Sequence, residues 1–259
     1  HKRNPKMPLI GNYPAKPANT VSSNGSNPHR PFAALLKRMA VKTILDFKKW
    51  LTNRGHREST AGHVSNAVII PHYNDTVRLR RCLSALTRDG TDGADIVVVD
   101  NGSTEPLEAL KREFPSVRFV YESGKGAALA RNRGVQETGA GTLAFLDADC
   151  VPAPGWLGTI ASVAGRSDIV GGAIDVFDET PAPRTGAQAF ETVFAFNYRN
   201  YIEKKGFSVT ANLVTSRDVF ETVGPFINGV SEDEEWCRRA RSKGFAVALA
   251  EELRVAHPT

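Results

Sequence analysis

The sequence has few cysteines, and their spacing excludes two common kinds of site. Cys82, Cys150 and Cys237 are the only three in 259 residues, and no two of them form a CxxC pair. An odd, widely spaced set does not predict a disulfide framework, and structural zinc needs clustered Cys and His ligands. We therefore interpret all three as thiols in the core or at its edge and expect a reducing, cytoplasmic location.

The sequence also lacks a long apolar segment and a dinucleotide-binding loop. There is no run of eighteen apolar residues, so the sequence predicts no membrane-spanning helix. The first predicted strand is not followed by a GxGxxG loop, which excludes a Rossmann dehydrogenase.

Basic residues are concentrated near the N-terminus. Residues 1–63 contain twelve Lys and Arg but only two acidic residues, whereas the remainder contains 21 basic and 26 acidic residues. The net charge of +5 therefore describes this N-terminal arm. An acidic body is a poor binder of phosphate backbones, so we expect no nucleic-acid partner.

The arm divides into two parts. Residues 1–30 are rich in Pro, Asn, Ser and Gly, which is typical of an extended linker. In residues 31–52, apolar side chains recur every three or four positions with lysines opposite, which predicts a basic amphipathic helix within a segment 31–63. Its apolar face either packs on the body or contacts an anionic membrane peripherally, on the cytoplasmic face.

Residues 64–259 carry the pattern of an α/β domain. Short apolar runs near 67–70, 96–100, 117–121 and 142–147 alternate with helical patterns. Such runs predict a mainly parallel, twisted sheet flanked by helices.

Polar clusters follow three of these strands: residues 71–75, 100–103 and 147–149. The carboxyl ends of parallel strands meet at one edge of a sheet, where ligands bind. Asp147 and Asp149 are two residues apart, and a divalent cation such as Mg²⁺ or Mn²⁺ would compensate their repulsion. The alternative is that they are turn carboxylates that accept backbone N–H groups.

Five segments stand in an order that strongly resembles the family 2 glycosyltransferases, whose nucleotide-sugar-binding fold is called GT-A. They are VIIPHYND (68–75), VVVDNGST (97–104), GAALARNRG (126–134), LDADC (146–150) and EDEEWCRR (232–239). The resemblance covers about residues 64–257. It implies metal-dependent, inverting transfer of a sugar from a nucleoside diphosphate-sugar, most commonly a UDP-sugar. The acceptor would be a hydroxyl of a saccharide or lipid-linked saccharide, as in polysaccharide biosynthesis.

The resemblance also implies roles on the donor side. The residues expected to contact the nucleotide are Pro71, Tyr73, Asp100, Arg131, Asn132 and Asp147. Among them, Asp100 resembles the carboxylate that accepts the nucleobase N–H, although a helix or turn cap is an alternative role. Asp149 looks like the metal ligand, assisted by Asp147 and by His257.

On the acceptor side, Asp233 resembles the general base that takes the proton of the attacking hydroxyl. Glu232, Trp236 and Asn212 are expected beside the acceptor. Repulsion among the four consecutive acids 232–235 would raise the pKa of one of them. The alternatives are an acidic first turn of a helix and, for Trp236, a core aromatic.

Two other functions remain open from the sequence. A sugar-nucleotide nucleotidyltransferase would need a Gly-rich basic loop after the first strand, and residues 72–75 contain no glycine. A non-catalytic nucleotide-sugar-binding module would not require Asp147, Asp149 and Asp233 together. Family members usually continue beyond a position like that of His257, so we expect a chain shortened at its C-terminal end.

Overall fold

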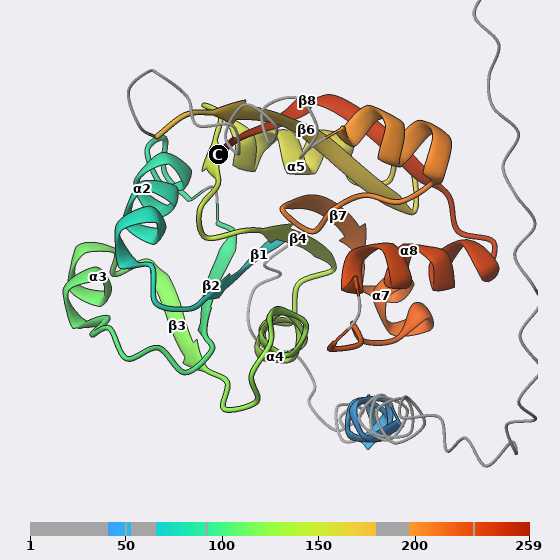
Figure 1. Ribbon diagram of the computed structural model, residues 1–259, viewed down its shortest axis with the longest axis horizontal. Helices are drawn as coiled ribbons and strands as arrows, with labels where there is room; N and C mark the ends of the chain where they lie inside the picture. The colour runs from blue at the N-terminus through green and yellow to red at the C-terminus, as the bar shows by residue number, and fades with distance from the viewer. Residues whose placement is uncertain (1–40, 50, 53–65, 92, 180–196, 230) are drawn as a thin grey trace, which may run out of the picture.

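The computed structural model describes residues 41–49, 51–52, 66–91, 93–179, 197–229 and 231–259. The predicted linker and the first part of the amphipathic helix lie outside these residues. Within them, an eight-stranded sheet forms the centre of the molecule, and helices cover both of its faces (Figure 1). The α/β architecture predicted from the sequence is therefore confirmed.

The sheet has the strand order β3-β2-β1-β4-β7-β6-β8-β5. Its strands are β1 (Asn66–His72), β2 (Asp95–Asp100), β3 (Val117–Tyr121), β4 (Thr142–Leu146), β5 (Val151–Pro152), β6 (Ile169–Phe177), β7 (Asn212–Ser216) and β8 (Val247–Pro258). The first four pair in parallel, as the unbroken apolar runs predict, and β8 pairs in parallel with β6. The other pairings, β4 with β7, β6 with β7 and β5 with β8, are antiparallel. The sheet is thus mixed, with a parallel half built by the N-terminal strands.

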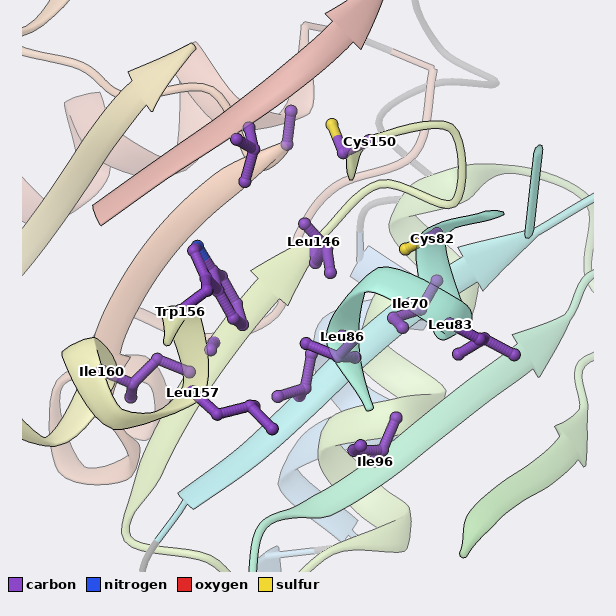
Figure 2. Packing of buried hydrophobic residues seen from close by; sticks show 14 of the residues in the cluster. Ile70, Cys82, Leu83, Leu86, Ile96, Leu146, Cys150, Trp156, Leu157 and Ile160 are labelled. Atoms are coloured by element: carbon purple, nitrogen blue, oxygen red, sulfur yellow. The ribbon is translucent and has the colours of Figure 1, made fainter. Parts of the chain in front are cut away.

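The helices are α2 (Thr76–Leu86), α3 (Glu108–Glu113), α4 (Ala127–Glu137), α5 (Trp156–Val163), α7 (Arg217–Val223) and α8 (Glu232–Ser242), with a π-helix η1 (Asn200–Lys205). Alternate residues of each inner strand face opposite layers. Val68 and Ile70 pack with α2, α3 and α5, and Figure 2 shows part of this layer. Ile69 and Phe145 pack with α4, α7 and α8 in the second layer.

Residues 41–49 and 51–52 are helical and lie beside the second layer (Figure 1). Phe47 is 3% exposed, and its ring packs edge-on against Phe220 of α7 with 5.9 Å between centroids. Leu51 packs against the same cluster. Part of the apolar stripe therefore packs on the body, which was the first of the two alternatives for this helix. No described helix has both the length and the apolar composition to cross a bilayer.

Candidate functional site

A cavity of about 270 Å³ opens where β1, β2 and β4 end. Because these strands are parallel neighbours, their three polar segments come to one edge of the sheet. The lining residues are Pro71, His72, Tyr73, Asp75, Asn101, Ala127, Arg131, Asp147, Ala148 and Asp149. This is the edge at which the sequence predicts ligand binding.

Unpartnered polar atoms are concentrated around this cavity. Among the described residues, six buried side-chain nitrogen or oxygen atoms have no hydrogen-bond partner. Four of the six belong to residues that line the cavity: both ring nitrogens of His72, Nε of Arg131 and Oδ1 of Asp149. A buried polar atom without a partner costs about 1–3 kcal/mol, so folded proteins keep few of them. Their concentration here indicates a site built to bind a polar ligand.

Arg131 joins three elements at this site. It lies on α4 with its side chain 5% exposed, 2.6 Å from Oδ1 of Asp147 and 2.8 Å from Oε1 of Glu232. Burial alone would lower the pKa of Arg131, but the two carboxylates outweigh it and raise the pKa. Arg131 therefore links the turn after β4 to the first residue of α8.

Asp149 is in contact with His257 from the end of β8. The antiparallel pairing of β5 with β8 brings the two chain segments together, and Nε2 of His257 lies 3.3 Å from Oδ2 of Asp149. Burial opposes ionisation of both groups. Their mutual contact nevertheless leaves the pKa of Asp149 below its usual value and the pKa of His257 above its usual value. Nδ1 of His257 lies 2.6 Å from the carbonyl oxygen of Pro258.

Two cysteines contact the turn that carries Asp147 and Asp149. The carbonyl oxygen of Asp147 accepts the N–H of Cys150 at 3.1 Å, and the thiol of Cys82 lies 3.8 Å from the same oxygen. Burial raises the pKa values of both thiols. All three cysteines are unbridged, as predicted, and all three lie in the core rather than at its edge.

The loops after β1 and β2 form the other end of the site. Tyr73 is 54% exposed at the cavity rim. Oδ1 of Asp100 accepts the N–H of Ser103 at 2.9 Å, so Asp100 does cap a turn, the alternative considered for it. Asn74 has a left-handed backbone with φ 47°, and its side chain accepts the N–H of Thr104 at 2.7 Å. The bond between Thr104 and Asn74 joins the loop after β2 to the loop after β1.

Asp233 lies in the first turn of α8. Burial raises its pKa, and the charge of Glu232 raises it further. Its Oδ1 accepts the N–H of Glu234 at 2.8 Å. The raised pKa agrees with the expectation for this acidic cluster, although burial contributes more than repulsion between carboxylates.

Three residues expected to contact the donor or the acceptor instead form hydrogen bonds with other groups of the protein. Asn132 forms two hydrogen bonds of 2.9 Å with the backbone of Phe226. Asn212 is fully buried, accepts from the indole N–H of Trp156 and donates to two backbone carbonyls. Trp236 is also fully buried, and its indole donates to the carbonyl of Gly224. In this structure the polar groups of these three side chains have partners within the protein.

Sequence reasoning assigned no role to His72, which the structure places at the cavity. Its position in the polar cluster 71–75 was the available signal. No three His, Cys, Asp or Glu side chains of the described part of the chain converge as a metal-binding group. Asp149 of the cavity lining and His257 are in direct contact, at 3.3 Å.

Comparison with known proteins found one family. Residues 67–224 match the family model described as Glycosyl transferase family 2. Glycosyltransferase AglE of Haloferax volcanii is 30% identical over 203 residues, which cover 74% of this chain and 66% of that protein. The uncharacterized glycosyltransferase YibD of Escherichia coli is 32% identical over 107 residues, 40% of this chain and 31% of that protein. The chain thus spans no more than about two thirds of these relatives.

Solved structures share the fold. The mannosyltransferase PcManGT from Pyrobaculum calidifontis, in complex with GDP-Man and Mn²⁺, matches with a TM-score of 0.56 and 16% identity, over 88% of this chain and 67% of that chain. S. aureus TarS 1-349, in complex with UDP-GlcNAc, matches with a TM-score of 0.55 and 15% identity, over 75% and 58% of the two chains. At these identities the likeness concerns the fold alone, which is the GT-A fold predicted from the sequence.

Proposed function

This chain belongs to glycosyltransferase family 2, and we propose that it transfers a sugar from a nucleoside diphosphate-sugar to a hydroxyl of a saccharide or lipid-linked saccharide. The observation that carries this proposal is the cavity at the ends of β1, β2 and β4. Four unpartnered buried polar atoms line it, and the residues that match the family's donor-binding motifs surround it. A polar, multiply charged ligand such as a nucleotide-sugar would supply their partners.

We propose that Asp149 and His257 hold Mn²⁺ or Mg²⁺ together with the donor diphosphate. Oδ1 of Asp149 is buried without a partner, which fits a carboxylate ligand. A hydrogen bond from Nδ1 of His257 to the Pro258 carbonyl would leave Nε2 as the ligand atom. Such ions usually bind one or two carboxylates plus phosphate oxygens and water, so two protein ligands suffice. The cation would stabilise the charge of the departing diphosphate.

Asp147 would have a different role from Asp149. Its Oδ1 is engaged by Arg131, so it contributes through its other oxygen, either to the cation or to the ribose. Nε of Arg131 has no partner, so its N–H could be donated to the bound nucleotide-sugar. The main role of Arg131 would be to hold Asp147 and Glu232 in place. Pro71, Tyr73 and Asp100 would surround the nucleobase and ribose.

Asp233 would act as the general base of an inverting displacement. The attacking hydroxyl must lose its proton as the bond to the sugar forms, on the face opposite the leaving diphosphate. A carboxyl with a raised pKa is a stronger base when ionised than an ordinary aspartate. Glu232, held by Arg131, would lie beside the acceptor.

One experiment tests the donor and the cation together. Thermal unfolding is measured with UDP-, GDP- and TDP-sugars, each with and without Mn²⁺, because a ligand that binds the folded state raises its stability. We expect one nucleotide to raise the unfolding temperature, and the rise to need the cation. The anomeric configuration of the transferred sugar then tests inversion. Binding of no nucleotide-sugar under any condition contradicts the proposed function.

We also propose a peripheral contact between the helix that includes residues 41–49 and 51–52 and an anionic membrane. Val41 and Leu45 are 55% and 59% exposed, and Lys42, Lys48 and Lys49 beside them are exposed as well. Apolar and basic side chains on one exposed surface suit a bilayer with anionic headgroups. Co-sedimentation with phosphatidylglycerol vesicles should exceed that with phosphatidylcholine vesicles and weaken with salt. Equal binding to both vesicle types contradicts this contact.

A further inference from the structure

Asn74 has a backbone conformation that residues other than glycine seldom adopt. Its φ is 47°, and no other non-glycine residue in the described ranges has a positive φ. The left-handed region brings Cβ close to the following carbonyl oxygen, which costs free energy, although Asn tolerates this region better than most residues. Such conformations are concentrated at functional sites, so the surroundings of Asn74 should show what this one achieves.

The connection between β1 and α2 is short. β1 ends at His72, and Asp75 is already the N-cap of α2, so the chain turns from strand to helix over Tyr73 and Asn74 alone. Tyr73 and Asp75 line the cavity, whereas Asn74 between them does not. The left-handed residue thus turns the chain tightly enough for both of its neighbours to reach the cavity.

Hydrogen bonds to the loop after β2 hold Asn74 in this conformation. Its N–H donates to Oγ of Ser103 at 2.9 Å. Its Oδ1 accepts the N–H of Thr104 at 2.7 Å, the hydroxyl of Thr104 at 3.2 Å and the N–H of Glu105 at 3.3 Å. Asn74 is therefore anchored through both its backbone and its side chain to three consecutive residues of the neighbouring loop.

The direction of the Tyr73 side chain depends on this anchor. Tyr73 is 54% exposed, so the side chains around it cover less than half of its surface and do not fix it by packing. Its backbone leads directly into Asn74, whose conformation is fixed. An aromatic side chain that is already oriented before binding contacts a ligand without the entropy cost of being ordered.

We propose that Asn74 is a positioning residue for the donor, and that it holds Tyr73 in the direction in which the ring contacts the nucleoside. Asn74 acts through Tyr73 and does not contact the donor itself. This role needs a side-chain carbonyl and a tolerance of left-handed backbone. Asparagine and aspartate combine the two, and alanine has neither. The inference rests on the proposed function, because it requires a nucleotide beside Tyr73.

A double-mutant cycle on nucleotide binding tests whether Asn74 acts through Tyr73. The dissociation constant of the tightest-binding nucleotide among UDP, GDP and TDP is measured by calorimetry with Mn²⁺. The proteins are the wild type, Asn74→Ala, Tyr73→Ala and the double variant. We expect each single change to weaken binding by roughly tenfold. The double variant should bind within about twofold of Tyr73→Ala, because no ring is left to position.

Three further variants separate positioning from general loss of structure. Asn74→Asp keeps an oxygen acceptor and tolerates the left-handed backbone, so it should bind within about threefold of the wild type. Asn197→Ala is the matched control, because Asn197 accepts the N–H of Asn200 but does not line the cavity, and its loss should leave binding unchanged. If Asn74→Ala does not fold, as judged by circular dichroism, Asn74→Gly takes its place and removes the carbonyl without backbone strain.

The outcomes distinguish the proposed function from this inference. A wild type that binds none of the three nucleotides overturns both together. Nucleotide binding by folded Asn74→Ala or Asn74→Gly within about twofold of the wild type overturns the role of Asn74 alone. Additive effects of the two single changes also overturn it, because Asn74 would then act by another route. So does unchanged binding by Tyr73→Ala, or an Asn74→Asp variant that binds as weakly as Asn74→Ala.

Discussion

At the residue scale, the pKa values of two half-buried carboxylates, Asp149 and Asp233, are shifted in opposite directions. The contact with His257 keeps the pKa of Asp149 low despite burial, whereas burial raises the pKa of Asp233. Environments that separate the pKa values of acids in one site often mark different chemical roles. Here an ionised carboxylate suits cation binding, and a carboxylate with a raised pKa suits proton acceptance.

Replacing Asp149 with Asn should abolish most of the transfer activity. The change removes one negative ligand, and the lost stabilisation of the leaving diphosphate should amount to several kcal/mol. Steady-state rates over a range of Mn²⁺ concentrations measure it, and Asp218→Asn is the control because Asp218 lies exposed on α7. Undiminished turnover in Asp149→Asn, or in excess chelator, would refute the proposed role.

Replacing Asp233 with Asn should slow transfer by roughly 10²–10⁴-fold, the usual contribution of a general base. Donor affinity should hardly change, because the base contacts the acceptor. In the wild type, kcat/KM should rise with pH through a pKa above the ordinary value of 3.8, since the ionised form is active. The matched control is Glu234→Gln, an exposed neighbour on α8.

The thermal stability of the Asp233→Asn variant gives a second test of the role of Asp233. The pKa of Asp233 is raised in the folded protein. A protein with such a carboxyl loses stability as the pH rises through the folded-state pKa, because the unfolded chain releases the proton more readily. Asp233→Asn should therefore unfold at the same or a slightly higher temperature at pH 7. A helix cap would behave in the opposite way, with lower stability and weakened donor binding together.

At the scale of elements, α4 connects the donor edge of the sheet to the segment that leads into α8. Arg131 contacts Asp147 and Glu232, and Asn132 beside it bonds both backbone groups of Phe226. Gly126 precedes α4 with φ 129°, and a Cβ there would lie 1.9 Å from Asn228 Oδ1. The position of Asp233 thus depends on contacts of α4 with segments about 100 residues away.

Replacing Asn132 with Ala should lower stability without changing how the donor binds. The backbone N–H and carbonyl of Phe226 would lose their partners, at a cost of about 1–3 kcal/mol in the free energy of unfolding. Urea denaturation measures this change, and Arg133→Ala on the same helix, which loses a partly exposed ion pair with Glu137, should change stability by less than about 1 kcal/mol. A large rise in donor KM with unchanged stability would restore the donor-binding role expected from the sequence.

At the scale of the whole molecule, the N-terminal helix is part of the folded body. Phe47 is buried against Phe220, whereas Leu45, two residues before it, is 59% exposed. One face of the helix thus adds to the second layer of the core, and Leu45 lies on an exposed part of its surface.

Replacing Phe47 with Ala should lower the free energy of unfolding by about 3 kcal/mol, because a large buried side chain is removed. Leu45→Ala is the control, and its effect should stay within about 0.5 kcal/mol because Leu45 is exposed. Thermal or urea unfolding measures both variants. Equal effects of the two would mean that the helix does not pack on the body in solution.

The local pattern of the sequence was sufficient to predict much of the fold. The four apolar runs correspond to β1, β2, β3 and β4 within two residues, because alternating and unbroken apolar patterns report burial on one or both faces of a sheet. Parallel pairing then brings Asp147, Asp149 and the segment 71–75 to one edge. These properties depend on neighbours in sequence and on simple sheet topology.

Tertiary structure decided which polar side chains line the cavity and which form hydrogen bonds with other groups of the protein. From sequence, Asn132, Asn212 and Trp236 looked like ligand contacts, but their partners are backbone groups and an indole brought together by folding. The polar cluster 71–75 was the one sequence signal for His72, and its unpartnered ring is visible only once the surrounding elements are packed. Hydrogen-bond partners in a core come from segments far apart in the chain, and no local pattern encodes them.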